Sequence, residues 1–164
     1  MFDPWKNDIF VDADGVIFNY DKLATSILGM PPREYEKIYG SDVYWAKLGE
    51  YDHFYLTLEL MPLADVLMEK LHYSFNPIIL TGSPSQLGEQ ARVDKFRCIE
   101  RYFGVSQRSI ICQSKNKYMY CRPGDILIDD WPKYKQKWLD AGGIWIDHID
   151  VSSTLEKLLE INVL

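Results

Sequence analysis

Short runs of apolar residues recur along the chain without the polar alternation that marks a strand with one exposed face. The runs lie at 9–11, 77–80, 110–112, 126–128 and 144–146. Uninterrupted apolar runs of this length are typical of parallel strands that are buried on both faces. The pattern therefore predicts the strands of a parallel sheet.

Amphipathic segments with helical periodicity lie between several of these runs. They are 61–72, 83–103, 131–141 and 152–159. Pro62 suits the first turn of one helix, and the glycine pair at 142–143 is a typical signal for the end of another. Alternation of strands and helices predicts an α/β fold, in which helices cover both faces of the parallel sheet.

Residues 19–60 interrupt this alternation and are too long for a simple connection. Short helical patterns occur within this stretch at 22–28, 33–38, 42–48 and 53–58, separated by glycine and proline. We interpret the stretch as a small helical cap inserted after the first strand. The catalytic core would then comprise residues 1–18 and 61–164.

The chain has 164 residues and a formal net charge of −6, which argues against a general nucleic-acid-binding surface. Two local basic spots remain. Lys115 and Lys117 could line a site that receives an anion, whereas Lys133, Lys135 and Lys137 fit a solvated helix face. The chain has no apolar run long enough to span a membrane, so we expect no membrane contact. It has no signal pattern, and its three cysteines form no CxxC pair, so we expect a cytoplasmic protein.

Polar residues follow four of the apolar runs directly, where an open parallel sheet forms its sites. The four groups are Asp12-Ala13-Asp14-Gly15, Thr81-Gly82-Ser83, Gln113-Ser114-Lys115 and Asp129-Asp130. Several carboxylates at neighbouring strand ends would repel one another unless a cation held them together. Mg²⁺ fits, because it binds carboxylate oxygens and keeps waters that a phosphate can replace.

The order of these groups resembles the four signature motifs of the haloacid dehalogenase superfamily. The motifs are carried by Asp12-Ala13-Asp14-Gly15-Val16, by Thr81, by a downstream lysine and by Asp129-Asp130. The resemblance implies a Rossmann-like core, bound Mg²⁺ and an aspartyl-phosphate intermediate. Members with aspartate at the position of Asp14 are typically phosphoryl-transfer enzymes, whereas true dehalogenases lack it.

The resemblance also implies roles for these residues. Asp12 would be the nucleophile, because a carboxylate that is ionised at neutral pH needs no activating base. Asp14 would protonate the leaving oxygen and then activate water. The phosphoryl oxygens would be bound by Thr81, Gly82 and Ser83, and the metal would be held by Asp12, Asp14 (through its backbone carbonyl), Asp129 and Asp130.

One lysine would neutralise charge on the phosphate and on the nucleophile, and three lysines compete for this role. Lys115 follows a predicted strand end, so we expect it to be the catalytic lysine. Lys95 lies in a predicted helix, where a lysine is usually solvated, and Lys117 is the third candidate.

A narrower resemblance links residues 95–104, and the motifs that follow them, to the 5′(3′)-deoxyribonucleotidases. It implies a nucleoside monophosphate as the substrate, with aromatic residues of the cap stacking on its base. The candidates for this stacking are Tyr44, Trp45, Phe54 and Tyr55. Alternatively, these aromatic residues form the cap's own core. A phosphatase of sugar phosphates or other small metabolites, and a non-catalytic binding domain, remain alternative functions.

Overall fold

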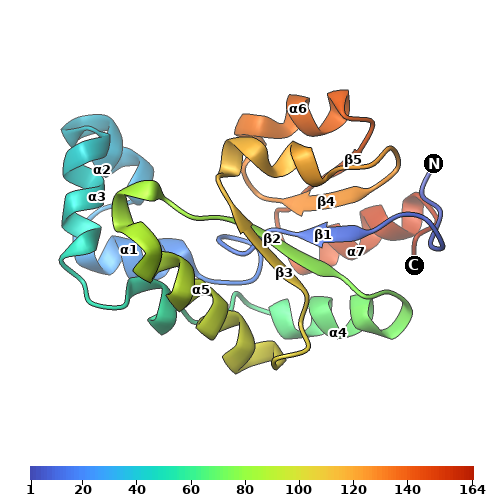
Figure 1. The fold of residues 1–164 in the computed structure, drawn as a ribbon, viewed down its shortest axis with the longest axis horizontal. Coiled ribbons are helices and arrows are strands. Elements are labelled where there is room, and N and C mark those ends of the chain that lie inside the picture. The colour runs from blue at the N-terminus through green and yellow to red at the C-terminus, as the bar shows by residue number, and fades with distance from the viewer. The chain divides into compact units, whose positions relative to one another are not determined.

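The computed structural model describes all residues, 1–164, which form two compact units. Unit 1 comprises Met1–Phe18, Leu60–Gly82 and Arg108–Leu164, and unit 2 comprises Asn19–Glu59 and Ser83–Gln107. Figure 1 shows their elements. None of the helices combines the length and the apolar character that crossing a bilayer requires.

Unit 1 is built on a five-stranded sheet in which every neighbouring pair of strands is parallel. Its strands are β1 (Ile9–Val11), β2 (Ile78–Gly82), β3 (Ser109–Cys112), β4 (Ile126–Asp129) and β5 (Ile144–Asp147), in the order β3-β2-β1-β4-β5. The five apolar runs and the predicted α/β class are confirmed. Val11 pairs with Ile79 of β2 and with Ile128 of β4, so the residues after these positions reach the same edge of the sheet.

Helices cover both faces of this sheet, as predicted. Unit 1 contains the helices α4 (Ala64–Ser74), α6 (Lys135–Asp140) and α7 (Val151–Glu160), and the short 3₁₀ helices η3 (Ser114–Tyr120) and η4 (Pro132–Tyr134). In Figure 1, α6 lies on one side of the sheet and α4 and α7 lie on the other. The helix predicted at 131–141 is thus divided into η4 and α6.

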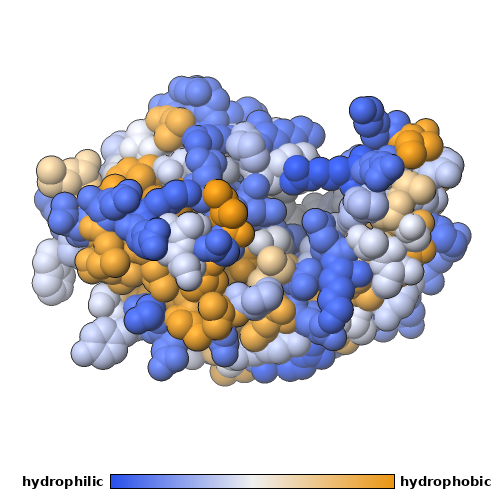
Figure 2. Space-filling view, turned by 180° about the vertical axis from the view of Figure 1, so that it is seen from behind, coloured by the Kyte–Doolittle hydropathy of each residue, from blue (hydrophilic) through white to orange (hydrophobic).

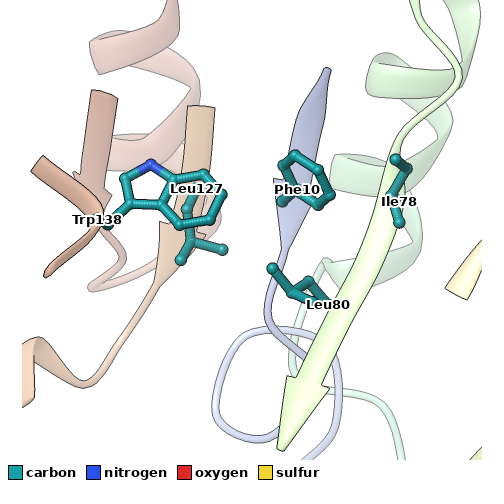
Figure 3. Packing of buried hydrophobic residues seen from close by; sticks show 5 residues of the cluster. All are labelled: Phe10, Ile78, Leu80, Leu127 and Trp138. Atoms are coloured by element: carbon teal, nitrogen blue, oxygen red, sulfur yellow. The ribbon is translucent and has the colours of Figure 1, made fainter. Parts of the chain in front are cut away.

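Alternate side chains of the strands form the apolar core beneath α6, because successive residues of a strand point to opposite faces. Figure 3 shows this cluster, which consists of Phe10, Ile78, Leu80, Leu127 and Trp138. The rings of Phe10 and Trp138 meet edge to face with their centroids 5.5 Å apart. Burial of each such side chain stabilises the fold by roughly 1.5–3 kcal/mol, which fixes the strands that carry the polar residues.

Unit 2 contains the segment that was predicted to form the cap. Its elements are α1 (Tyr20–Leu28), α2 (Pro32–Tyr39), α3 (Ser41–Gly49), η1 (Phe54–Thr57), η2 (Ser85–Leu87) and α5 (Gly88–Phe103). The sequence-based division assigned 83–107 to the core, whereas in the structure these residues belong to unit 2. The reason is that α5 packs on η1, where the Lys95 Nζ lies 4.4 Å from the centre of the Tyr55 ring.

The face shown in Figure 2 carries hydrophilic areas, in blue, and apolar areas, in orange. Exposed large hydrophobic side chains of unit 1 include Leu63, Ile149, Leu159 and Ile161.

Candidate active site

The sheet brings two of the predicted aspartates together at the ends of β1 and β4. The amide of Asp12 donates a hydrogen bond to the carbonyl of Ile128 (2.9 Å), so the pairing of β1 with β4 continues one residue beyond β1. Asp12 and Asp129 are therefore held side by side, and both are buried. Two buried carboxylates require a compensating cation.

Lys117 supplies that cation. Its Nζ donates to Asp12 Oδ1 (2.6 Å) and to Asp129 Oδ2 (2.8 Å), and the lysine itself is only 7% exposed. Burial lowers the pKa of Lys117, but the two carboxylates outweigh burial and raise this pKa above its usual value. The backbone amide of Trp131 donates to the other oxygen of Asp129, Oδ1 (2.9 Å). The ion pair with Lys117 occupies one oxygen of Asp12 and does not involve Oδ2.

The preference for Lys115 is therefore corrected, because the Lys115 side chain is exposed and forms none of these ion pairs. The reason is the conformation of η3. A 3₁₀ helix has three residues per turn, so Ser114 and Lys117 share one face while Lys115 points elsewhere. Lys95, the other candidate, belongs to unit 2 and is buried against Tyr55.

Asp12, Asp129 and Asp130 together form a group of carboxylates whose ligand oxygens all lie within 4.8 Å of one another. Burial, and next the charge of Asp12, raise the pKa of Asp129 to about 6 and that of Asp130 to about 7. A divalent cation would relieve this repulsion. The donor set is oxygen only, which suits Mg²⁺. The side chain of Asp14 is not part of this carboxylate group, although its charge contributes to the raised pKa of Asp130. Metal binding through the backbone carbonyl of Asp14 stays a prediction.

Two glycines allow the close approaches that build this site. A Cβ on Gly15, whose φ is +88°, would lie 2.3 Å from Asp130 Oδ2. A Cβ on Gly82 would lie 1.9 Å from Ser114 Oγ. Any side chain at either position would therefore displace a polar group of the site.

The predicted phosphate-binding residues lie at the end of β2. Thr81 is fully buried, and Gly82 is the last residue of this strand. Ser83 follows directly and is partly buried. The sequence placed Ser114 in the polar group after the third strand but assigned it no role, and its hydroxyl lies against Gly82. The three-residue spacing between Ser114 and Lys117 was the signal that could have identified it.

The aromatic residues that were proposed to stack on a base mostly lie inside unit 2. Tyr44, Phe54 and Tyr55 are buried, and Trp45 is partly exposed. The ring centroids of Phe54 and Tyr55 lie 5.0 Å apart, and those of Tyr44 and Trp45 lie 4.7 Å apart. This is the packing that the alternative interpretation, a core of the cap itself, predicted. Stacking on a substrate base stays a prediction.

His148 directly follows β5 and is buried. Its Nδ1 pairs with Thr154 Oγ1 (2.7 Å), and its backbone amide donates to the Asp129 carbonyl (3.0 Å). Burial lowers the pKa of His148, so the ring is neutral at neutral pH. We therefore assign it a structural role behind the end of β4.

The fold of the chain is similar to the folds of solved haloacid dehalogenase-type hydrolases. One similar structure is the L-2-haloacid dehalogenase from Xanthobacter autotrophicus, which has chloropropionic acid covalently bound. The TM-score is 0.53 at 13% identity, and the match covers 100% of this chain and 85% of that chain. A hydrolase from Streptococcus pneumoniae TIGR4 also has a TM-score of 0.53, with 13% identity and coverage of 94% and 98%.

A third similar structure is a haloacid dehalogenase superfamily hydrolase, subfamily IA, variant 1, from Geobacter sulfurreducens PCA. It has a TM-score of 0.53, 10% identity and coverage of 93% of this chain and 96% of that chain. At these identities the likeness establishes the fold. No protein-family model and no curated protein matches the sequence.

Proposed function

We propose that the chain is a magnesium-dependent phosphomonoesterase of the haloacid dehalogenase superfamily and that it acts through an aspartyl phosphate on Asp12. The observation that carries this proposal is the ion-paired cluster at the ends of β1 and β4, where Lys117 bridges Asp12 and Asp129. The bridge fixes the orientation of Asp12. A carboxylate held in this way is a competent nucleophile without a base.

Asp12, Asp129 and Asp130 would hold the metal, which would neutralise charge on the phosphoryl oxygens and on these carboxylates. Asp12 attacks phosphorus, and the bond from phosphorus to the ester oxygen breaks. Asp14 donates the proton that the leaving oxygen takes up, and the same carboxylate then removes a proton from the water that hydrolyses the aspartyl phosphate. Lys117 counters the negative charge that the phosphoryl group brings to Asp12.

Thr81 and Ser114 flank Gly82, and their hydroxyls would bind the phosphoryl oxygens together with backbone amides. The neighbour from Xanthobacter carries chloropropionic acid as a covalent adduct, so the fold supports covalent catalysis. Halide chemistry is not our proposal, because Asp14 supplies an acid–base group that dehalogenases of this superfamily lack. We propose nucleoside monophosphates as the substrate class, and sugar phosphates are the alternative.

The test is release of p-nitrophenol from p-nitrophenyl phosphate with Mg²⁺ and with EDTA. We expect turnover that requires Mg²⁺ and that Asp12→Asn abolishes while the circular dichroism spectrum is retained. Turnover in EDTA equal to that in Mg²⁺, or an active and folded Asp12→Asn protein, would refute the proposal.

A further inference from the structure

Exposed aromatic rings and lysines alternate along η3, η4 and α6 of unit 1. We call this group the basic–aromatic surface, and it consists of Tyr118, Trp131, Lys133, Tyr134 and Lys137. Trp131 is 43% exposed and Tyr118 is 38% exposed, and both lysines are exposed. A contiguous group of exposed aromatic side chains rimmed by polar residues is typical of an interaction site.

The lysines of this surface lie over the faces of its rings. Lys133 Nζ is 5.1 Å from the centre of the Trp131 ring and 5.4 Å from that of Tyr134. Lys137 Nζ is 5.2 Å from the centre of the Tyr118 ring and 5.8 Å from that of Tyr134. The surface is thus one continuous set of contacts that joins η3 to η4 and α6.

Neither lysine of the surface is neutralised by a carboxylate. Lys133 and Lys137 take part in no ion pair, whereas Lys135 of the same helix region is paired with Asp147 (2.6 Å). Residues 113–139 contain six basic and three acidic residues, a formal charge of +3, in a chain whose net charge is −6. This stretch is therefore more basic than the chain as a whole. Lys133 and Lys137 are solvent-exposed, as the sequence indicated, and they also contact the interleaved rings.

The basic–aromatic surface begins at the candidate active site. Tyr118 directly follows Lys117, and the Trp131 amide donates to Asp129 Oδ1.

We propose that this surface binds single-stranded nucleic acid and presents the terminal phosphate of the strand to Asp12. The proposal rests on the phosphomonoesterase function and extends its substrate from a mononucleotide to a strand. Aromatic faces stack bases without sequence preference, and lysines neutralise the phosphodiesters that follow one another along the strand.

Smaller ligands use only part of this surface. A mononucleotide would place its single phosphate at Asp12 and leave Lys133 and Lys137 without an anion. A sugar phosphate would offer no base to the rings. A strand uses both features.

The experiment measures binding and hydrolysis of an oligothymidylate of about ten nucleotides, a length within the usual site size. The strand carries a phosphate at one end and fluorescein at the other, in a 5′-phosphate and a 3′-phosphate version. Fluorescence anisotropy with Asp12→Asn protein gives affinities between about 50 and 200 mM salt. Lys133→Gln/Lys137→Gln in this background removes two charges of the surface. The matched control, Lys6→Gln/Lys70→Gln, removes two exposed lysines of unit 1 elsewhere.

We expect the surface variant to bind at least about fivefold more weakly than the control at low salt. The slope of log affinity against log salt should become shallower by about 1.4, or 0.7 for each lost phosphate contact. With Asp12 restored, the surface variant should lose kcat/KM for the phosphorylated strand by a larger factor than for p-nitrophenyl phosphate. The 5′ and 3′ versions identify which end is processed.

Equal affinities and slopes in the surface variant and the control would overturn the proposal. Hydrolysis of p-nitrophenyl phosphate without binding that depends on the surface would refute the strand-binding site while leaving the phosphomonoesterase intact. Conversely, strand binding that depends on the surface, with no phosphate release from any substrate, would support the surface and refute the enzyme.

Discussion

Substitution of Lys117 by methionine tests the electrostatic centre of the site. The change keeps most of the side-chain volume but removes the charge that joins Asp12 and Asp129 (Nζ to Oδ distances of 2.6 and 2.8 Å). Removal of one partner from a buried ion pair costs about 3–5 kcal/mol when the remaining charge is uncompensated. Loss of one preorganised donor for transition-state charge lowers kcat by roughly 10²–10³-fold.

The stability loss should depend on pH. Burial and Asp12 already hold the pKa of Asp129 at about 6, above the ordinary value of 3.8 for an aspartate. Without Lys117 this pKa rises further, so the folded protein takes up protons that the unfolded chain releases. A raised carboxyl pKa favours the folded state at low pH and destabilises it above the folded pKa. In EDTA, the variant should therefore lose about 3 kcal/mol at pH 8 and clearly less at pH 5.

Urea unfolding in EDTA, followed by tryptophan fluorescence, measures these free energies, and p-nitrophenyl phosphate hydrolysis measures turnover. Lys115→Met is the matched control, because Lys115 lies two residues away in the same 3₁₀ helix but is exposed. It should keep turnover within about twofold and stability within about 0.5 kcal/mol. Equal losses in the two variants, or a Lys117→Met loss that does not vary with pH, would refute the reasoning.

Other substitutions and conditions test separate parts of the account. After burial, the charge of Asp12 is the largest cause of the raised pKa values of Asp129 and Asp130, and Asp12→Asn removes this charge. The Mg²⁺-free variant should therefore keep its fold at pH 8. Unfolding of this variant at pH 8 would contradict the expectation. Protons compete with the metal below the pKa values of Asp129 and Asp130, which are about 6 and 7. Calorimetry should therefore find Mg²⁺ binding at least about tenfold weaker at pH 5.5 than at pH 8. An affinity that does not change with pH would contradict this set of metal ligands. Asp129→Asn should raise the Mg²⁺ concentration for half-maximal turnover more than Asp130→Asn does, and an unchanged requirement in both would remove them from the metal site. Gly82→Ala should lower the free energy of unfolding by about 1–3 kcal/mol, because the new Cβ would clash with Ser114 Oγ. Adding Ser114→Ala to this variant should recover part of the lost stability. Additive losses in the double variant would contradict the contact.

The sequence was sufficient to predict the strands of the sheet and the positions of Asp12 and Asp129 at its edge. Buried parallel strands have a simple apolar pattern, and the polar residues after β1, β2 and β4 stand out against it. Asp12 and Asp129 were therefore located correctly at neighbouring strand ends.

The lysine could not be chosen from the sequence, because the choice depends on the path of the chain after β3. If that segment were extended, Lys115 would be nearest the strand end. The 3₁₀ conformation of η3 instead turns Ser114 and Lys117 to the same face. The sequence also did not show that α5 belongs to unit 2. This assignment follows from packing between η1 and α5, which lie about 40 residues apart in the chain. The hydrogen bond between His53 and Asp94 is one such contact.

Peptide mapping after rapid acid quench is the most direct test of the nucleophile. The wild-type protein would be mixed with Mg²⁺ and a phosphorylated substrate, quenched within one turnover, digested and examined by mass spectrometry. The account predicts one phosphoryl group on the peptide that contains Asp12, and none on that peptide from Asp12→Asn protein. Phosphate release without any phosphorylated Asp12, or with the phosphoryl group on another residue, would contradict it.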